Sequence, residues 1–416
     1  MNWYTSTFLL IFILSTFLPV FGDEETSSSA SEEIILNALF SKTPELTSRV
    51  TAGETAVRIA IDDINTYLDD IGSRYHVILN ITYYSGEPGS SLSALSSIQG
   101  KNSGTVIGYF SSSELEEVRD YANSNNILIL STGSSAPSLA IPNDMILRFN
   151  PDDTKQAMAI HALLKQKNIS YLIPLVRDDV WGRDLISSIA TKTDGTVTLS
   201  EPVMYDPNEN DYGMILNQLD QNTGRVLEEQ IPESTAILAA TFGEIVPIME
   251  KASDPAYQNL SQIRWIGTDG NSYIPEIIRS TAATRFAADR QFIGTTLSPQ
   301  PENIVLPLSN RLSEKLGYEP DASAYALYDI AWITTLANLA NGSEDGQSRY
   351  TAINTIADLY NGISGEMALN ENGDRSEAHY AYWEVRTDGR EGKWKIIGTY
   401  SWYAPEIPID LIFFEN

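Results

Sequence analysis

Two short loops rich in hydroxyl groups are the segments of this sequence best suited to hold a ligand. The first, GYFSSS at 108–113, follows an apolar run and precedes a helix-start pattern; the second, STGSSAP at 131–137, follows another apolar run. Serine hydroxyls and the free backbone N–H groups of a helix start can bind an anion. Parallel strands would bring both loops to one sheet edge, where they could hold a small carboxylate without Lys or Arg. The alternative is that both loops are ordinary Ser-rich caps.

The sequence lacks the motifs of the common catalytic and metal sites. It has no Cys, and its three histidines, His76, His161 and His379, are too far apart for an HExxH zinc motif. It also has no GxSxG nucleophile elbow, no GxxxxGK[ST] phosphate loop and no GxGxxG dinucleotide loop. We therefore expect a protein that is not an enzyme and uses neither a cofactor nor a metal.

Length and charge narrow the class of protein further. The chain has 416 residues, with 27 Lys and Arg against 55 Asp and Glu, for a net charge of −28. A single core stops growing near ~250–300 residues, so the length predicts two lobes. The negative charge would repel a phosphate backbone, and we expect no nucleic-acid partner.

The N-terminal segment predicts export from the cytoplasm. Residues 1–22 are uncharged, with an apolar stretch at 8–21 and small residues around Gly22, as in a secretory signal peptide. No Lys or Arg lies near Met1, so an uncleaved membrane anchor at residues 3–21 is the competing interpretation. The acidic, Ser-rich residues 23–32 are predicted to be a flexible spacer. Without Cys, the chain cannot be a lipoprotein.

Short apolar runs alternate with amphipathic segments along the rest of the chain. The runs predicted to be strands are 77–84, 105–109, 127–130, 171–176, 236–240, 263–267 and 292–296. Helix patterns lie between them, beginning for example at 113–116 and at 153–156. This alternation predicts an α/β fold with parallel sheets covered by helices, which bind ligands beyond the carboxyl ends of their strands.

Six segments in register resemble the type I periplasmic binding proteins of the leucine/isoleucine/valine-binding family, whose fold is shared by the ligand-binding regions of metabotropic-glutamate-type receptors. The segments are VIGYFSSSEL (106–115), ILILSTGSSAPSLA (127–140), LRFNPDDTKQAMAI (147–160), LVRDDVWGRDL (175–185), IRWIGTDG (263–270) and LNENGDRSEAHYAYWEV (369–385). The resemblance implies two doubly wound lobes that close on a ligand, joined by three crossovers at 148–152, 292–299 and 361–368.

The resemblance also implies the division of the chain. Lobe I is expected to consist of residues 33–150 and 299–362, and lobe II of residues 151–298 and 363–402. Residues 403–416 are then expected to form a C-terminal tail.

The resemblance assigns the ends of an amino acid to particular residues. Ser112 matches the serine whose hydroxyl binds the ligand α-carboxylate, and Ser135 matches the residue whose backbone N–H binds the same group. Gly133 matches the residue whose carbonyl accepts a hydrogen bond from the α-ammonium. Ser134 lies between Gly133 and Ser135 and completes the predicted site in lobe I. Asp269 matches the acidic residue of lobe II that pairs with the ammonium.

Further pocket positions follow from the same register. Trp181 matches an aromatic residue that closes over the ligand, Thr241 or Phe242 matches a second position, and Tyr325 is a further candidate. Leu46 stands where the branched-chain-specific proteins place an aromatic residue, which argues against leucine itself but leaves an amino-acid-like ligand possible.

The resemblance implies an extracytoplasmic solute-binding protein that delivers a small, amino-acid-like ligand to an ABC-type membrane transporter. The alternative is a sensor or surface-tethered receptor domain of the same fold, with a signalling partner in place of a transporter. A third hypothesis is an exported hydrolase, for which the sequence offers no catalytic residues.

Overall fold

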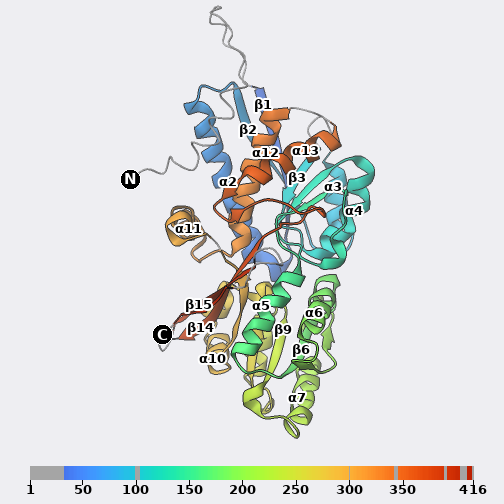
Figure 1. Ribbon diagram of the computed structural model, residues 1–416, viewed down its shortest axis with the longest axis vertical. Coiled ribbons are helices and arrows are strands. Elements are labelled where there is room, and N and C mark those ends of the chain that lie inside the picture. Colours follow the sequence, from blue (N-terminus) through green and yellow to red (C-terminus); the bar gives the residue numbers. More distant parts are fainter. Residues whose placement is uncertain are drawn as a thin grey trace, which may run out of the picture.

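The computed structural model describes residues 32–98, 104–298, 300–341, 345–387, 391–402 and 410–414. The predicted signal peptide and the predicted spacer up to residue 31 lie outside the described residues. The described chain forms two lobes along the long axis of the molecule, each built around its own β-sheet (Figure 1).

Lobe I is built on five parallel strands in the order β2-β1-β3-β4-β5. The strands are β1 (Glu32–Ser41), β2 (Tyr75–Tyr84), β3 (Thr105–Gly108), β4 (Leu128–Ser131) and β5 (Ile146–Arg148). The helices of this lobe are α2 (Thr47–Asp70), α3 (Ser90–Ser97), α4 (Ser112–Asn125), α11 (Glu302–Leu316), α12 (Ala322–Asn341) and α13 (Gly346–Leu359). Strand order reverses between β1 and β3, so the loop after β3 begins at the position where such sheets bind ligands.

Lobe II repeats this plan and extends it. Its sheet runs β16-β15-β14-β11-β10-β9-β6-β7, with β8 also paired to β6. The strands are β6 (Tyr171–Arg177), β7 (Thr198–Leu199), β8 (Val203–Tyr205), β9 (Thr235–Ala240), β10 (Arg264–Gly267), β11 (Ile293–Leu297), β14 (Ala378–Thr387), β15 (Gly392–Trp402) and β16 (Asp410–Phe413). Strand order reverses between β6 and β9. The loops after these strands, which carry Trp181 and Phe242, therefore lie at the second reversal.

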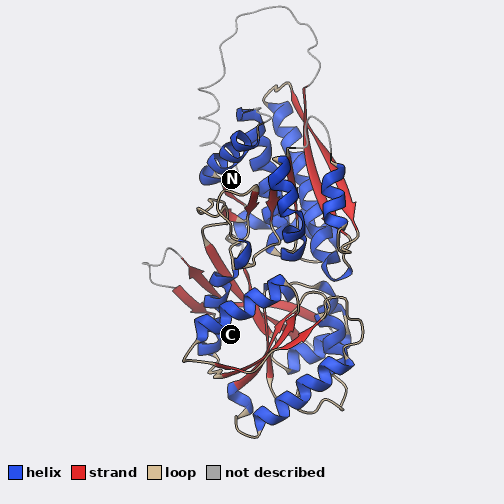
Figure 2. Ribbon diagram, turned by 90° about the vertical axis from the view of Figure 1, so that its right-hand side faces the viewer, coloured by secondary structure: helices blue, strands red, loops and turns tan. Residues whose placement is uncertain are grey.

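Helices cover both sheets (Figure 2). The helices of lobe II are α5 (Asp153–Gln166), α6 (Val180–Thr193), α7 (Gly213–Leu227), α8 (Ile245–Ala252), α9 (Pro275–Arg279) and α10 (Thr281–Asp289). Most strand residues of β4, β6 and β9 are buried, as expected for parallel strands covered on both faces.

Polar caps fix where the helices next to the predicted site begin. Ser111 and Glu114 form a reciprocal capping box at the start of α4. The carboxylate of Asp152 caps α5, and that of Asp179 caps α6. These caps place Ser112, Asp153 and Trp181 in the first turns of the three helices.

The chain passes between the lobes three times: after β5, after β11 and after α13. A buried ion pair joins two of these passages. The Arg148 guanidinium binds Asp374 through two bonds, Nε–Oδ1 at 2.6 Å and Nη2–Oδ2 at 2.7 Å, and both side chains are 1% exposed. The same passages also share backbone hydrogen bonds: the Arg148 N–H donates to the Gly373 carbonyl, and the Arg375 N–H donates to the Arg148 carbonyl. The third passage contains the short hairpin β12 (Asn361–Gly362) and β13 (Gly365–Glu366).

The predicted α/β fold of two doubly wound lobes is confirmed, and each of the seven predicted strands overlaps an observed one. The structure adds strands that the sequence analysis missed: β1, β5, β7, β8, β12, β13, β14, β15 and β16. One of them, β16, lies in the predicted C-terminal tail and pairs antiparallel with β15. Within the residues that the structure describes, no helix combines the length and apolar character needed to cross a bilayer.

Candidate functional site

The structure brings the predicted serines together at the carboxyl ends of β3 and β4. The Ser112 hydroxyl lies 3.1 Å from that of Ser134 and accepts hydrogen bonds from the backbone N–H groups of Ser135 and Ala136, both at 3.3 Å. Ser112, Ser134 and Ser135 are all buried. Because Ser112 accepts two bonds from N–H groups, its own proton can be donated either to the Ser134 hydroxyl or to a bound group.

Gly133 lies where a side chain would not fit. A Cβ atom there would stand 2.6 Å from the Phe110 carbonyl oxygen and 2.9 Å from Cε1 of the Tyr109 ring. Glycine therefore lets the loop after β4 pack against the loop after β3. The two loops act as one unit around Ser112.

Asp153, in the first turn of α5, connects this serine loop to lobe II. Its carboxylate oxygen Oδ2 accepts a bond of 3.0 Å from the Ser135 hydroxyl, and its backbone N–H donates to the Ser135 carbonyl at 2.9 Å. Burial raises the pKa of the Asp153 carboxyl well above its usual range, and the negative charge of Asp269 raises it further. The two carboxyls are thus close enough to repel each other.

Asp269 begins the short 3-10 helix η4 (Asp269–Asn271), directly after β10. Its Oδ1 atom is buried without a hydrogen-bond partner among the described residues. Burial raises the pKa of this carboxyl, while the nearby Gln156 amide and the Arg49 guanidinium oppose the rise. An ionised Asp269 would therefore be stabilised by a cation placed at Oδ1.

Arg49 of α2 reaches from lobe I to the backbone around Asp269. Its Nη2 donates to the carbonyls of Asp269 and, at 3.1 Å, Ser272, while its Nη1 lies 2.8 Å from Oδ2 of Asp321. The guanidinium is thus already engaged by protein groups, and it holds the Asp269 loop against lobe I.

Aromatic side chains lie beside the acidic loop. Trp181 stacks on Phe242, with the two ring centroids 4.6 Å apart. The Arg177 guanidinium also lies over the Phe242 ring, 4.5 Å from its centroid. A Cβ on Gly270 would stand 2.6 Å from the Trp181 ring, so this indole lies against the residue that follows Asp269. Thr241 is fully buried, and its hydroxyl accepts a bond of 3.1 Å from Asn271.

Tyr325 lies in a different environment from the other predicted site residues. It packs in a hydrophobic cluster of lobe I with Ala52, Leu308 and Leu312. Burial raises the pKa of its hydroxyl to about 12. The charge of Asp321, the ion-pair partner of Arg49, also acts on this hydroxyl. Tyr325 therefore packs in lobe I near the Arg49 contact, and the other predicted residues lie around the boundary of the lobes.

The sequence analysis missed four residues at this boundary: Arg49, Tyr109, whose hydroxyl interacts with the Arg49 guanidinium, Asp153 and Gln156. Gln156 is 1% exposed, and neither atom of its amide has a hydrogen-bond partner among the described residues. The segment DDTKQ was recognised only as a helix start, although the spacing of Asp153 and Gln156 puts both on one helical face. Arg49 had no local signal, because its partners lie far away in the sequence.

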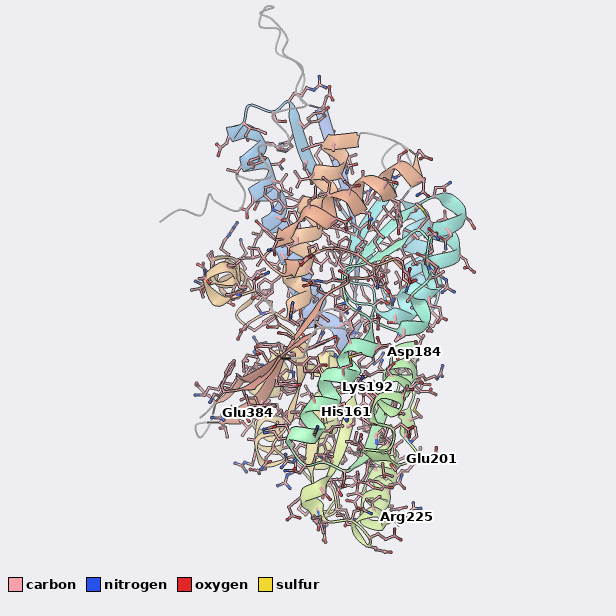
Figure 3. The ribbon with its side chains drawn as sticks, in the orientation of Figure 1. His161, Asp184, Lys192, Glu201, Arg225 and Glu384 are labelled. Carbon is pink, nitrogen blue, oxygen red and sulfur yellow. The ribbon has the colours of Figure 1, made fainter. Side chains whose placement is uncertain are left out.

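Direct contacts hold the two lobes together around these residues. The Gly243 N–H donates to the Glu45 carbonyl at 3.1 Å, and Nη2 of Arg177 lies 3.3 Å from the Glu45 carboxylate. The Ser138 N–H donates to Asp184 at 2.8 Å. Asp184 lies at the end of lobe II that faces lobe I (Figure 3). The structure is therefore a closed arrangement of the lobes.

Outside this region the structure has a groove on lobe II, but the described residues form no metal site. The described part of the chain holds no group of three or more His, Asp and Glu that could bind a metal ion. An open groove on lobe II is lined by residues that include Ala190, Asp194 and Gln230. It lies at the opposite end of α6 from Asp184, and none of the predicted site residues lines it.

Comparisons with known proteins cover nearly the whole described chain. A family model described as the receptor family ligand-binding region matches residues 52–388. An uncharacterized protein of Methanocaldococcus jannaschii is 24% identical over 365 residues, which cover 82% of this chain and 83% of that relative.

Solved structures share the fold at low sequence identity. The leucine-binding protein LivK from Thermotoga maritima is 17% identical with a TM-score of 0.71, covering 87% of this chain and 97% of its own. An ABC transporter substrate-binding protein from Desulfitobacterium hafniense, in complex with Leu, is 15% identical with a TM-score of 0.65, covering 88% and 100%. A solute-binding protein from R. palustris, in complex with benzoate, is 11% identical with a TM-score of 0.68. The match covers 87% of this chain and 95% of that protein.

Proposed function

This chain belongs to the family of receptor ligand-binding regions, and from that premise we propose that it binds a small amino acid or amino-acid-like ligand between its two lobes. The family and the type I periplasmic binding protein fold, both expected from the sequence, are shown by the family match and the structural likeness. General solute binding fits this family, whose structural neighbours are binding proteins. The ligand, the partner and the site residues are our proposals.

One observation carries the proposal: groups of opposite polarity meet across the lobe boundary. Lobe I contributes the Ser112 hydroxyl, whose proton can be donated to a carboxylate while the backbone N–H groups of Ser135 and Ala136 hold its oxygen in place. Lobe II contributes the unpartnered Oδ1 of Asp269, which can accept from an ammonium. A zwitterion has both groups, and it would be held without a basic side chain.

Closure of the lobes is the output of this protein. A ligand that contacts both lobes binds the closed arrangement more tightly than an open one, and so shifts the population toward closure. We propose that an ABC-type transporter recognises the closed form outside the cytoplasm. The ABC transporter substrate-binding proteins among the structural neighbours support this role, and a binding protein of this kind needs no catalytic group.

Calorimetry with the purified protein and a panel of amino acids and amides tests the proposal. We expect one or more members of the panel to bind. Replacement of the buried hydroxyl in Ser112→Ala should weaken binding at least tenfold, because a hydrogen bond to a charged group contributes ~1.5–3 kcal/mol. Its exposed neighbour offers a matched control, and Ser113→Ala should leave affinity unchanged. Absence of binding across the panel would rule out the amino-acid-like ligand.

A further inference from the structure

Gln156 is a buried amide whose two polar atoms are both unpaired. It lies in the first turn of α5 and is 1% exposed, yet neither Oε1 nor Nε2 has a hydrogen-bond partner among the described residues. Buried amides in native proteins are almost always hydrogen-bonded, because removing them from water without a partner is unfavourable. A partner supplied from outside the chain would satisfy this amide.

The contacts of α5 place this amide at the ligand site proposed above. Asp153, three residues earlier on the same helical face, holds the Ser135 hydroxyl of lobe I at 3.0 Å. On its other side Gln156 lies beside Asp269, whose Oδ1 is also buried and unpaired. Gln156 therefore stands between the serine loop of lobe I and the acidic loop of lobe II.

Electrostatics determines which end of the amide faces which neighbour. An amide oxygen next to an ionised carboxylate would be repelled, whereas the amide N–H₂ group donates to it. Nε2 therefore faces the Asp269 carboxylate. Oε1 is then left to face the position that an ammonium bound at Asp269 would occupy.

We propose that Gln156 is a specificity-determining residue whose Oε1 accepts one N–H of the ligand ammonium, beside Asp269 and the carbonyl that the family resemblance assigns to Gly133. This inference rests on the proposed function and adds a requirement to it. A primary ammonium has three N–H groups, and the site then offers three acceptors. A secondary ammonium has two, so an N-methylated ligand leaves one buried acceptor unpaired and places a methyl group against it. The site is thus selective for ligands with a primary ammonium.

Paired ligands and a paired set of variants test this inference. L-Leucine, L-alanine and L-glutamine are each compared with their N-methyl derivatives by calorimetry on the whole protein. The wild-type protein should bind the primary amine of the best pair at least tenfold more tightly. Gln156→Leu, which keeps the approximate volume and removes both polar atoms, should weaken binding of the primary amine about tenfold and reduce the selectivity within the pair to less than threefold. Gln166→Leu, at an exposed position on the same helix, is the matched control and should behave as the wild type.

The outcomes separate this inference from the function on which it rests. One outcome contradicts only this inference: the wild-type protein binds a primary amine, and Gln156→Leu keeps the wild-type selectivity or loses affinity for both members of the pair equally. Gln156 would then not contact the ligand ammonium, and the proposed function would stand. If the wild-type protein binds none of the six probes, the amino-acid-like function is overturned and this inference with it. Thermal unfolding of ligand-free Gln156→Leu adds a readout: its Tm should equal or exceed that of the wild type, and a large fall would show that the amide is needed for structure.

Discussion

At the scale of single residues, the charge state of Asp269 governs the proposed binding. Burial raises the pKa of this carboxyl above its ordinary value, and only the ionised form can pair with an ammonium. Affinity for a zwitterion should therefore be full above the raised pKa and fall as the pH drops through it. Isothermal titration at decreasing pH would show this loss beginning at a higher pH than expected for an ordinary Asp carboxyl, whose pKa is ~3.9.

Asp269→Asn provides the control for this pH dependence. The variant should bind the zwitterion at least tenfold more weakly than the wild type does. Its affinity should change little over the same pH range, because the titrating carboxyl is gone. An affinity that falls equally steeply in wild type and variant would assign the pH dependence to another group. Asp153 is the first to examine, because burial raises its pKa as well.

The residues that could be predicted from the sequence are those with a local signal. Ser112 follows an apolar run and begins a capped helix, and Asp269 follows another apolar run in a turn-forming segment. Arg49 and Gln156 have no such signal. The carbonyl that Arg49 contacts belongs to Asp269, 220 residues away, and the amide of Gln156 is unusual only because the fold buries it. Tyr325 was predicted as a pocket residue, and its side chain packs in a hydrophobic cluster of lobe I.

At the scale of elements, the strands that could be predicted are the continuous apolar runs. β6 and β9 are buried along nearly their whole length and were found. β15 was missed because Lys393 and Lys395 interrupt its apolar residues. β1 was missed because it begins with two glutamates, the first of which, Glu32, was assigned to the polar spacer.

The ion pair between the first and third passages should be a major source of stability for the junction. Arg148→Met would leave the Asp374 carboxylate buried at 1% exposure without its partner, which costs about 3–5 kcal/mol for a broken buried pair. Urea unfolding of the ligand-free protein measures the loss. Arg58→Met removes an ion pair that is largely exposed on α2 and should cost less than about 1 kcal/mol. A cost for Arg148→Met no larger than that of the control would contradict the assignment.

At the scale of the whole molecule, closure depends on a backbone contact between the lobes. Gly243 donates its N–H to the Glu45 carbonyl, and a Cβ there would stand only 2.6 Å from that oxygen. Gly243→Ala should therefore hold the lobes apart and weaken ligand binding, while each lobe keeps its own core. Small-angle scattering with saturating ligand should show a larger radius of gyration for the variant than for the wild type.

Gly213→Ala is the matched control for the added Cβ atom of Gly243→Ala. A Cβ at Gly213 would meet the end of the flexible Lys251 side chain at 3.1 Å, which can move aside at the surface of lobe II. We expect wild-type scattering and affinity for this variant. If Gly243→Ala also closed on ligand as the wild type does, the Glu45 contact would not control closure.

The burial of the proposed site has a consequence for rates. Ser112 and Gln156 are each 1% exposed and Trp181 is 3% exposed, so a ligand held among them has no path to water while the lobes are together. Release then requires that the contacts of Arg49, Glu45 and Ser138 across the boundary separate first. The opening of the lobes sets an upper limit on the dissociation rate of every ligand, whatever its affinity. Stopped-flow measurements should find that different ligands dissociate no faster than one common limit, and that this limit rises when a boundary contact is removed.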